Sequence, residues 1–306
     1  MKRLTTENIT AAVCERFASC ADPRLRRIMS ALIVHLHDFT RDVKLTPDEW
    51  MAAIRFLTDT GHKCDEKRQE FILLSDTLGL SALVDLMANG SGDPEATESS
   101  LLGPFFREGA PELEMGSSIA RHIKGREIVV RGHLRSLQHR AVAGATIDVW
   151  QASPTGLYDL QSAKPEEMDL RARLRSDGEG RYWFRSVKAA SYPVPTDGPV
   201  GGMLNAVGRH PYRPAHIHFK IAAAGYRPLT TALYIAGDEY LDSDAVFGSR
   251  GSLVVDYQTS AMRGEAPGGM DSIEFDFVLD NVRSTEPAVS HEATGAARSS
   301  KVRTGH

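Results

Sequence analysis

The chain has 306 residues, and its 36 lysines and arginines nearly balance 40 aspartates and glutamates, giving a formal net charge of -4. This balance leaves no basic excess for binding nucleic acid or an anionic membrane. Hydrophobic residues make up 42% and charged residues 25%, a composition that excludes disorder of the whole chain. The three cysteines form no CxxC pair, so neither a disulfide framework nor a thiolate metal site is expected. No apolar run suits a signal peptide or a membrane span, and we expect a cytoplasmic protein.

Apolar residues recur at helical spacing through the first 92 or so positions. Helices are expected over about 6–20, 23–38, 66–78 and 81–88, with another that starts after Thr46 and ends at Gly61. The start signal Thr46-Pro47-Asp48-Glu49 is the clearest, because Thr46 and Glu49 fit a capping box. The turn-forming residues 89–94 break the pattern, so we predict a helical domain over residues 1–95.

After residue 125 the pattern changes to short strands separated by Gly, Pro and Asp turns. The strands expected are Arg126–Leu134, Ala145–Gln151, Gly180–Val187, Ala215–Ile221, Leu229–Ile235 and Ile273–Leu279. They predict a β-sandwich over residues 96–282, and therefore an α+β protein overall. Residues 152–179 and 188–213 are expected to be long functional loops. Residues 283–306 have the composition of a flexible tail.

Two histidines on one of these strands form the most specific local feature. In the segment 213–221, alternation places Ala215, Ile217 and Phe219 on the core face and His216 and His218 on the other. Side chains two positions apart can converge on one metal ion. The alternative is a pair of solvated histidines on an exposed sheet face.

A His-x-His site needs further ligands, and this half of the chain contains no cysteine. All eight tyrosines lie between Tyr158 and Tyr257, and Tyr158 and Tyr192 each follow a predicted strand. A phenol has a pKa near ~10, but a strongly charged cation displaces its proton. Two phenolates and two imidazoles would favour ferric over ferrous iron. For either tyrosine alone, packing at the base of a loop is the competing interpretation.

Motifs between residues 103 and 219 resemble those of the intradiol ring-cleavage dioxygenases. The resemblance extends to about residue 280 and rests on Gly103-Pro104-Phe105, Ile147–Ala152 with Gly156-Leu157-Tyr158, Gly180–Ser186, Tyr192–Pro195 and Arg213–Phe219. It implies that Tyr158, Tyr192, His216 and His218 bind a non-haem Fe(III). It also implies an N-terminal helical domain that forms a homodimer, followed by a catalytic β-sandwich, and it suggests a lipid bound in the helical domain.

Within the family, the hydroxyquinol-cleaving members are the most similar, on Glu70–Gly79 and Tyr240–Gly248. By this resemblance the ring pocket would be lined by Leu73, Asp76, Leu101, Leu102, Gly103, Pro104, Phe105, Val194, Pro195, Arg213 and Val246. Asp76 would accept a hydrogen bond from a third ring hydroxyl, unless it is a surface aspartate of its helix. The family's catechol-cleaving members tend to have glutamine after the Thr-Thr pair, where this chain has Ala232.

The resemblance implies that a chelating aromatic diol or triol reacts with O2. Tyr192 would leave the metal as substrate binds and take one of its protons. Arg213 would stabilise the developing negative charge, its alternative being a surface arginine. Two other functions stay open: cleavage of catechol or a chlorocatechol, and a non-catalytic β-sandwich whose His-x-His is vacant or holds zinc.

Overall fold

The computed structural model describes residues 3–66, 68–90, 92–162, 164, 166–259 and 270–282. Of these, residues up to Leu73 form one compact unit together with Thr196–Ala206. The second unit contains Leu74–Pro195 and the residues from Val207 onward. The tail predicted over 283–306 lies outside the described residues.

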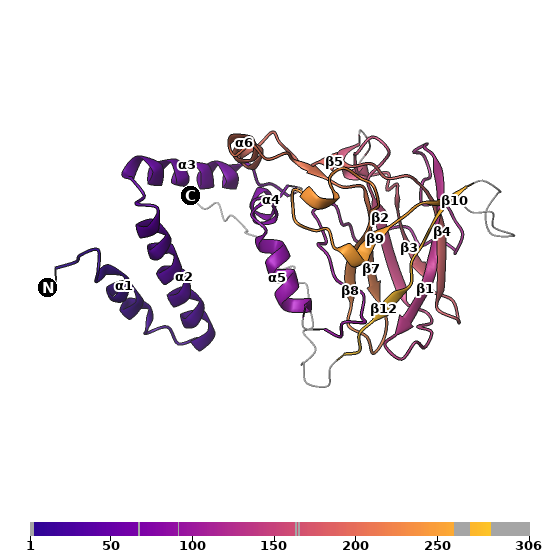
Figure 1. The fold of residues 1–306 in the computed structure, drawn as a ribbon, viewed down its shortest axis with the longest axis horizontal. Coiled ribbons are helices and arrows are strands. Elements are labelled where there is room, and N and C mark those ends of the chain that lie inside the picture. The colour runs from indigo at the N-terminus through magenta and orange to yellow at the C-terminus, as the bar shows by residue number, and fades with distance from the viewer. Residues whose placement is uncertain are drawn as a thin grey trace, which may run out of the picture. The chain divides into compact units, whose positions relative to one another are not determined.

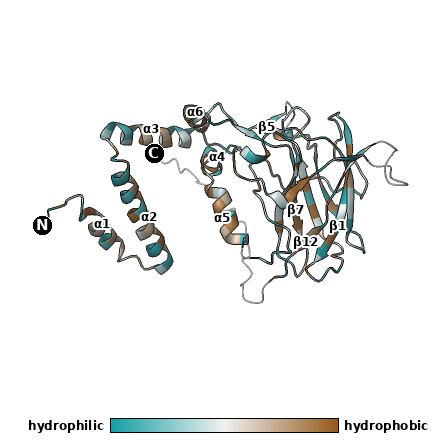
Figure 2. Ribbon diagram, viewed as in Figure 1, coloured by the Kyte–Doolittle hydropathy of each residue, from teal (hydrophilic) through white to brown (hydrophobic). Residues whose placement is uncertain are grey.

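The first unit is helical (Figure 1). Its complete helices are α1 (Ile9–Phe17), α2 (Pro23–Asp42), α3 (Pro47–His62) and α6 (Pro199–Ala206). The predicted capping box of α3 is confirmed, since the side chain of each partner, Thr46 and Glu49, bonds the other's backbone amide. The helix continues through Gly61 to His62, one residue beyond its predicted end. Helices α2 and α3 each contain both polar and apolar residues along their length (Figure 2).

The two compact units divide after Leu73, and residues 196–206 return to the first unit. Helix α4 (Glu70–Thr77) spans the division, and α5 (Leu80–Asn89) belongs with the sheets. The α6 segment joins the helical unit because Asp197 pairs with Arg68 and Lys63. Among the described residues, no single helix has the length and apolar character to cross a membrane, and α4 and α5 meet these criteria only as a pair bent by 74°.

The second unit contains two main sheets (Figure 1). In the first, β1 (Glu127–Ser136) pairs with β4 (Arg181–Val187), β11 (Asp271–Glu274) and β12 (Phe277–Leu279), and β11 pairs with β10 (Gln258–Thr259). The second has the order β3 (Arg171–Arg175), β2 (Thr146–Gln151), β7 (His216–Ala222), β8 (Leu229–Ile235) and β9 (Val254–Val255). A small ribbon pairs β5 (Tyr192–Pro193) with β6 (Tyr212–Arg213).

Most predicted strands are confirmed within one or two residues, with three differences. The strand expected over 273–279 is two strands, because the Asp276 carboxylate accepts the amide of His133 and interrupts the pairing with β1. The expected loop 152–179 contains β3, and the expected loop 188–213 contains α6, β5 and β6. Strand β3 does alternate arginines with Ala172 and Leu174, but two apolar residues in so short a segment are a weak strand signal.

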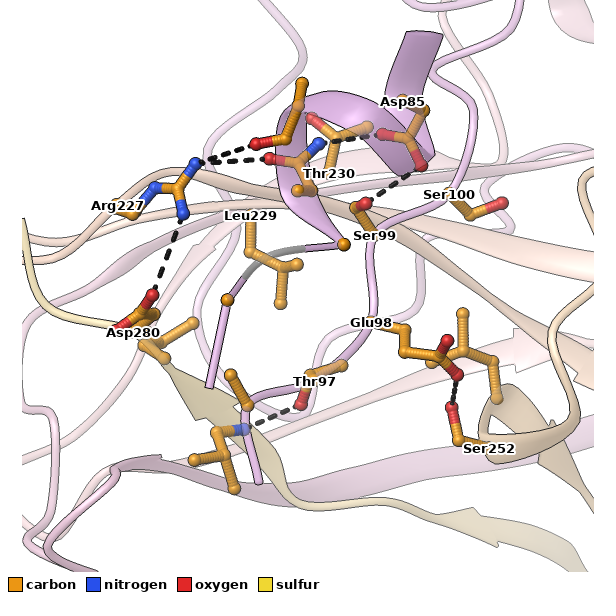
Figure 3. Close-up of a pocket in the computed structure, with 18 of the residues that line it drawn as sticks. Asp85, Thr97, Glu98, Ser99, Ser100, Arg227, Leu229, Thr230, Ser252 and Asp280 are labelled. Atoms are coloured by element: carbon orange, nitrogen blue, oxygen red, sulfur yellow. Dashed lines mark hydrogen bonds and ion pairs between the residues drawn. The ribbon is translucent and has the colours of Figure 1, made fainter. Parts of the chain in front are cut away.

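A cavity of about 890 Å³ lies within the second unit, lined by one side of α5 along its length, residues 92–102 and parts of both sheets. Its polar side chains largely satisfy one another (Figure 3). Arg227 bonds Asn89 and pairs with Asp280, Asp85 accepts from Ser99, and Glu98 accepts from Ser252.

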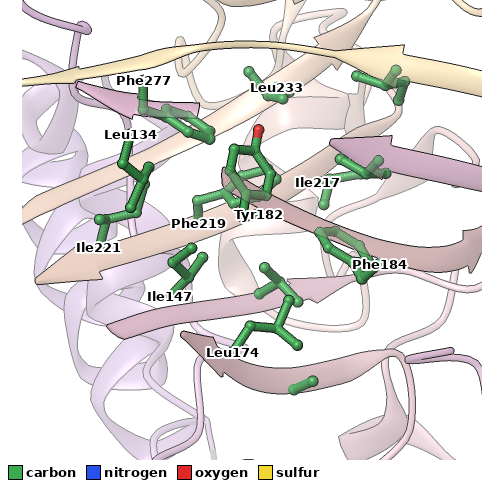
Figure 4. Packing of buried hydrophobic residues seen from close by; sticks show 14 of the residues in the cluster. Leu134, Ile147, Leu174, Tyr182, Phe184, Ile217, Phe219, Ile221, Leu233 and Phe277 are labelled. Carbon is green, nitrogen blue, oxygen red and sulfur yellow. The ribbon is translucent and has the colours of Figure 1, made fainter. Parts of the chain in front are cut away.

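The hydrophobic core lies between the two sheets (Figure 4). Phe184 of β4 and Phe277 of β12 meet Phe219 of β7 with ring centroids 4.9–6.3 Å apart. The predicted core positions Ala215, Ile217, Phe219 and Ile221 all belong to this cluster. The fold is therefore a β-sandwich in which one face of β7 is fixed by the core and its other face is available for chemistry.

Candidate metal centre and active site

His216 and His218 lie side by side on the face of β7 that points away from the core. They are only 1% and 2% exposed, so they are not the solvated pair of the alternative interpretation. Their Nε2 atoms lie 3.0 Å apart, and their rings stand at 85° to one another. Nδ1 of His216 lies 2.7 Å from the carbonyl oxygen of Pro214 and must carry the proton, since a carbonyl only accepts. Its Nε2 therefore keeps a lone pair for a cation.

Burial keeps both imidazoles neutral. It lowers the pKa of His216 to about 3, with a further contribution from the charge of Arg213. It also lowers the pKa of His218 well below the ordinary value, assisted by His216 and Arg213. Neutral imidazole is the form that binds metals, so the site keeps its histidines ready at neutral pH.

Neighbouring strands fix the orientation of these rings. Trp150 of β2 and Ala232 of β8 stand opposite His218, and Tyr234 of β8 stands opposite His216. The indole of Trp150 stacks on His218 with centroids 4.7 Å apart and planes within 6°. Rigid packing of this kind limits the rotation of the imidazole without using its nitrogens.

Tyr158 and Tyr192 reach the same place from two separate loops. Tyr158 precedes the short helix Asp159–Gln161, and its backbone amide is held by the Gln161 side chain. Tyr192 lies in β5, opposite Arg213 of β6. The two phenol oxygens lie 3.3 Å apart, and that of Tyr158 is 3.5 Å from Nε2 of His216. Both tyrosines are buried.

The spacing of these donor atoms suits a metal ion. Ligand atoms roughly 2.1 Å from one cation and about 90–110° apart are separated by about 3.0–3.4 Å, close to the 3.0–3.5 Å measured between neighbours here. Burial, and then the neighbouring Tyr192, raise the pKa of Tyr158 well above its ordinary value. A bound cation would reverse this preference and favour the phenolate. Among the described residues, no cluster of three or more His, Cys, Asp or Glu could hold a metal, so a site here requires the phenols.

Arg213 supplies a buried positive charge beside these donors. Its Nη1 lies 3.4 Å from the phenol oxygen of Tyr192 and 3.2 Å from Nε2 of His216. Burial opposes its charge, but the carboxylate of Asp244 and other neighbours raise its pKa well above the ordinary value. Arg213 is therefore a permanent cation and not the surface arginine of the alternative interpretation.

Comparison with known proteins agrees with this geometry. A sequence profile described as "Dioxygenase" matches residues 102–281, and one described as "Catechol dioxygenase N terminus" matches residues 22–94. The chain belongs to the intradiol ring-cleavage dioxygenases. Members of this family use non-haem iron.

Several members are similar over nearly their whole length. A 6-chlorohydroxyquinol 1,2-dioxygenase of Cupriavidus pinatubonensis is 47% identical over 92% of this chain and 99% of the relative. A hydroxyquinol 1,2-dioxygenase of Rhizobium sp. is 44% identical over 89% and 95%. The crystal structure of a hydroxyquinol 1,2-dioxygenase from Pseudomonas putida matches with a TM-score of 0.85 and 44% identity, over 90% of this chain and 99% of that one. A catechol 1,2-dioxygenase from Acinetobacter radioresistens has a TM-score of 0.82 at 27% identity, over 95% and 98%.

Some of the residues expected to line a dioxygenase ring pocket lie against the donor atoms. Phe105 stacks on Tyr158 with centroids 4.3 Å apart, and Gly103 lies against Nε2 of His218, which an added Cβ would approach to 3.6 Å. The backbone amide of Val246 donates a hydrogen bond to the carboxylate of Asp244. Asp76 is 7% exposed, so it is not a surface residue, and burial raises its pKa.

The other expected pocket residues are less closely tied to the donors. Val194 is buried and Pro195 half-buried, while Leu102 and Pro104 are exposed. Leu101 and Leu102 border the separate cavity described above. Leu73 is buried and belongs to the helical unit.

Several residues that support the site were not predicted from the sequence. Arg171 of β3 forms a buried ion pair with Asp159 and donates to the carbonyl of Phe105, which ties together the two segments that carry Phe105 and Tyr158. Tyr234 shares the site face of β8 with Ala232, and the alternation of that strand could have identified it. Asp244 has no such signal, because it lies in an irregular loop.

Proposed function

We propose that this chain is an Fe(III)-dependent dioxygenase that cleaves hydroxyquinol, 1,2,4-trihydroxybenzene, with O2 to 3-hydroxy-cis,cis-muconate, the enol form of maleylacetate. The observation that carries the proposal is the convergence of two phenol oxygens and two imidazole nitrogens in one buried site. Tyr158, Tyr192, His216 and His218 would hold the iron. Bound ferric iron would draw electron density from a chelated ring and so make the ring reactive toward O2.

The side chains have separable roles in this proposal. Tyr192 would hold the iron in the free enzyme and would accept a proton from a ring hydroxyl of the substrate at its phenol oxygen. Arg213, 3.4 Å from that oxygen, stabilises negative charge that develops on the substrate. Tyr158 stays in place, held by the stacked ring of Phe105. The buried setting keeps water away from the reacting ring.

The preference for a triol rests on the named relatives and on Asp76. Relatives 41–47% identical are named for hydroxyquinol or its 6-chloro derivative. Asp76 is buried, and the charge of Arg213, a residue of the site, partly offsets the effect of burial on the pKa of Asp76. Catechol lacks a third hydroxyl and would add no hydrogen bond to the one that this carboxyl accepts from Ser81.

The helical unit is proposed to form a homodimer. Apolar side chains on α2 recur at helical spacing and are about half exposed: Leu25, Ile28, Leu32, Leu36 and Phe39. Trp50, Ile54 and Leu57 of α3 are exposed to a similar degree. A face of this size suits a partner subunit, and a bound lipid would cover what the partner leaves open. The three unpaired cysteines fit a reducing, cytoplasmic location.

One experiment tests metal, chelation and substrate together. The iron-loaded protein should show a tyrosinate-to-iron charge-transfer band, and anaerobic addition of hydroxyquinol should shift it. A panel of hydroxyquinol, 6-chlorohydroxyquinol, catechol and a chlorocatechol should then give the highest kcat/KM with one of the two triols. A higher kcat/KM with catechol would overturn the substrate assignment, and a colourless iron-loaded protein would overturn the ferric site.

A further inference from the structure

A closed ring of buried hydrogen bonds surrounds the inner end of Arg213. Asp244 accepts from Nε of Arg213 at 3.1 Å and from Nη2 at 3.3 Å. Gly248 donates its amide to Asp244, and its carbonyl accepts from the Ser100 hydroxyl. Ser100 also contacts the Tyr234 hydroxyl at 2.8 Å, and this hydroxyl accepts from Nη2 of Arg213 at 3.4 Å. The ring thus joins residues from four separate segments of the second unit.

This arrangement leaves only one guanidinium nitrogen of Arg213, Nη1, to face the site. Nε and Nη2 are committed to Asp244 and Tyr234, so only Nη1 points at the phenol oxygen of Tyr192 and at Nε2 of His216. A metal on His216 would occupy that nitrogen and leave Tyr192 as the partner of Nη1. Because Arg213 is 3% exposed, water cannot replace these contacts and set its direction.

Asp244 is equipped to hold its charge while buried. Besides Arg213, its oxygens accept the amides of Val246 and Gly248 at 3.2 and 3.0 Å and the hydroxyl of Ser249 at 3.4 Å. Such bonds to a carboxylate are among the stronger hydrogen bonds in proteins. The same residue therefore orients Arg213 and shapes the loop that carries Val246.

Gly248 completes the ring because its backbone lies close against the Arg213 guanidinium and the Tyr234 hydroxyl. A Cβ added there would lie 2.8 Å from Nη2 of Arg213 and 2.9 Å from the Tyr234 hydroxyl. Both distances are too short, and the guanidinium and the phenol are themselves held by hydrogen bonds. Any side chain at position 248 must displace the guanidinium or the phenol.

We propose that Asp244 and Tyr234 are positioning residues that aim Nη1 of Arg213 at the oxygen of Tyr192, with Ser100 and Gly248 completing the support. The inference rests on the proposed function, because Tyr192 is there the group that leaves the metal and takes a proton. Its consequence is that Asp244 governs turnover more than substrate binding. A phenolate that loses the Nη1 donor also becomes a better electron donor to iron.

The substitution Asp244→Asn keeps the shape of the side chain but removes its negative charge. The new side-chain NH2 group would face groups that are themselves donors, Arg213 and the backbone amides of Val246 and Gly248. We expect kcat to fall roughly 10- to 100-fold, with KM changed less than about threefold. The charge-transfer band of the iron-loaded variant should move to longer wavelength, which a loss of stability alone would not cause. Tyr234→Phe should lower kcat about 3- to 10-fold and shift the band in the same direction. Asp242→Asn on the exposed surface of the same loop and Tyr226→Phe are the matched controls.

A double-mutant cycle tests whether Asp244 acts through Arg213. If it does, Arg213→Ala and Arg213→Ala with Asp244→Asn should have the same kcat within about twofold. Gly248→Ala should reproduce the band shift, whereas Gly251→Ala, whose Cβ meets nothing within 4 Å, should leave it unchanged.

The outcomes separate this inference from the proposed function. A wild-type protein without the band or dioxygenase activity would refute the function. A wild type with both, whose Asp244→Asn and Tyr234→Phe variants keep the native band position and kcat, would refute the positioning role. Additive losses in the cycle would also refute it. Should Asp244→Asn not fold, Tyr234→Phe and Gly248→Ala decide the question by band position.

Discussion

The phenol oxygens of Tyr158 and Tyr192 lie 3.3 Å apart, although the residues are 34 positions apart in the chain. The Tyr158 hydroxyl donates a hydrogen bond to that of Tyr192, and both phenols also stand beside the imidazole of His216. A shared cation would account for the arrangement. In the proposed function, Tyr158 would stay bound to this cation, whereas Tyr192 would be the ligand that substrate displaces.

Replacing either tyrosine should therefore have distinguishable effects. Tyr158→Phe should weaken the charge-transfer band both before and after anaerobic substrate addition, and should lower kcat/KM by more than the roughly 10- to 100-fold typical of outer-shell partners. Tyr192→Phe should alter the band of the free enzyme more than that of the substrate complex. Absorption spectra of the iron-loaded variants measure both effects.

Tyr182→Phe provides the control for these variants. Tyr182 is buried in the sandwich core, where its hydroxyl donates to the carbonyl of Phe275. Its loss should reduce stability without changing colour. An unchanged band in Tyr158→Phe would remove Tyr158 from the metal site.

The buried ion pair of Arg171 and Asp159 should be important for stability. Arg171→Met leaves the Asp159 carboxylate buried with its main partner missing, which typically costs about 3–5 kcal/mol. It also frees the carbonyl of Phe105, so the band of the iron-loaded protein should broaden. Chemical denaturation measures the free energy of unfolding, and Arg175→Met on the same strand is the control, since Arg175 is exposed. Equal stability of the two variants would contradict this role.

The ion pairs of Asp197 should make the helical unit sensitive to acid. Hydrogen bonds from Arg68 and Lys63 lower the pKa of Asp197 to about 2 from an ordinary 3.8. A carboxyl with a lowered pKa stabilises the fold above its unfolded pKa, and this contribution is lost as the pH falls from about 4 to about 2. Asp197→Asn should lower stability at pH 7 by less than about 1 kcal/mol, because the side chain is 65% exposed.

Thermal unfolding between pH 2 and pH 7 checks this expectation. The difference between Asp197→Asn and the parent should disappear near pH 2. Asp59→Asn, an exposed aspartate of α3, should show no such pH-dependent difference. A difference for Asp197→Asn that persists at pH 2 would argue against the ion pairs as its source.

Local patterns in the sequence were enough to predict the sandwich and the two histidines. The alternation in β7 determines both the core side chains and the direction of His216 and His218, because each position has only two possible faces. The role of the tyrosines followed from family resemblance, since nothing local brings Tyr158 to Tyr192. The Ser100 to Tyr234 contact spans 134 positions and depends on tertiary packing. Helix α6 was missed because its two glycines argue against a helix.

Asp76 is expected to determine the preference for a third ring hydroxyl. A hydrogen bond to a charged acceptor contributes about 1.5–3 kcal/mol, or roughly 10- to 150-fold in relative rate. Asp76→Leu should therefore lower kcat/KM for hydroxyquinol by this factor and leave that for catechol nearly unchanged. The free energy of unfolding of this variant should not fall greatly, because the substitution replaces a buried carboxyl with an apolar side chain. Asp93→Leu, at an exposed position, is the control.

The pH dependence of the preference gives an independent test. Burial raises the pKa of Asp76 above its ordinary value, and a hydrogen bond from Ser81 and the charge of Arg213 only partly oppose this. As the pH falls through this raised pKa, the carboxylate takes up a proton and the ionised acceptor is lost. The ratio of kcat/KM for hydroxyquinol to that for catechol should fall accordingly, and in Asp76→Asn it should not vary with pH. A parent ratio that stays constant down to pH 4 would show that the third hydroxyl is recognised by another group.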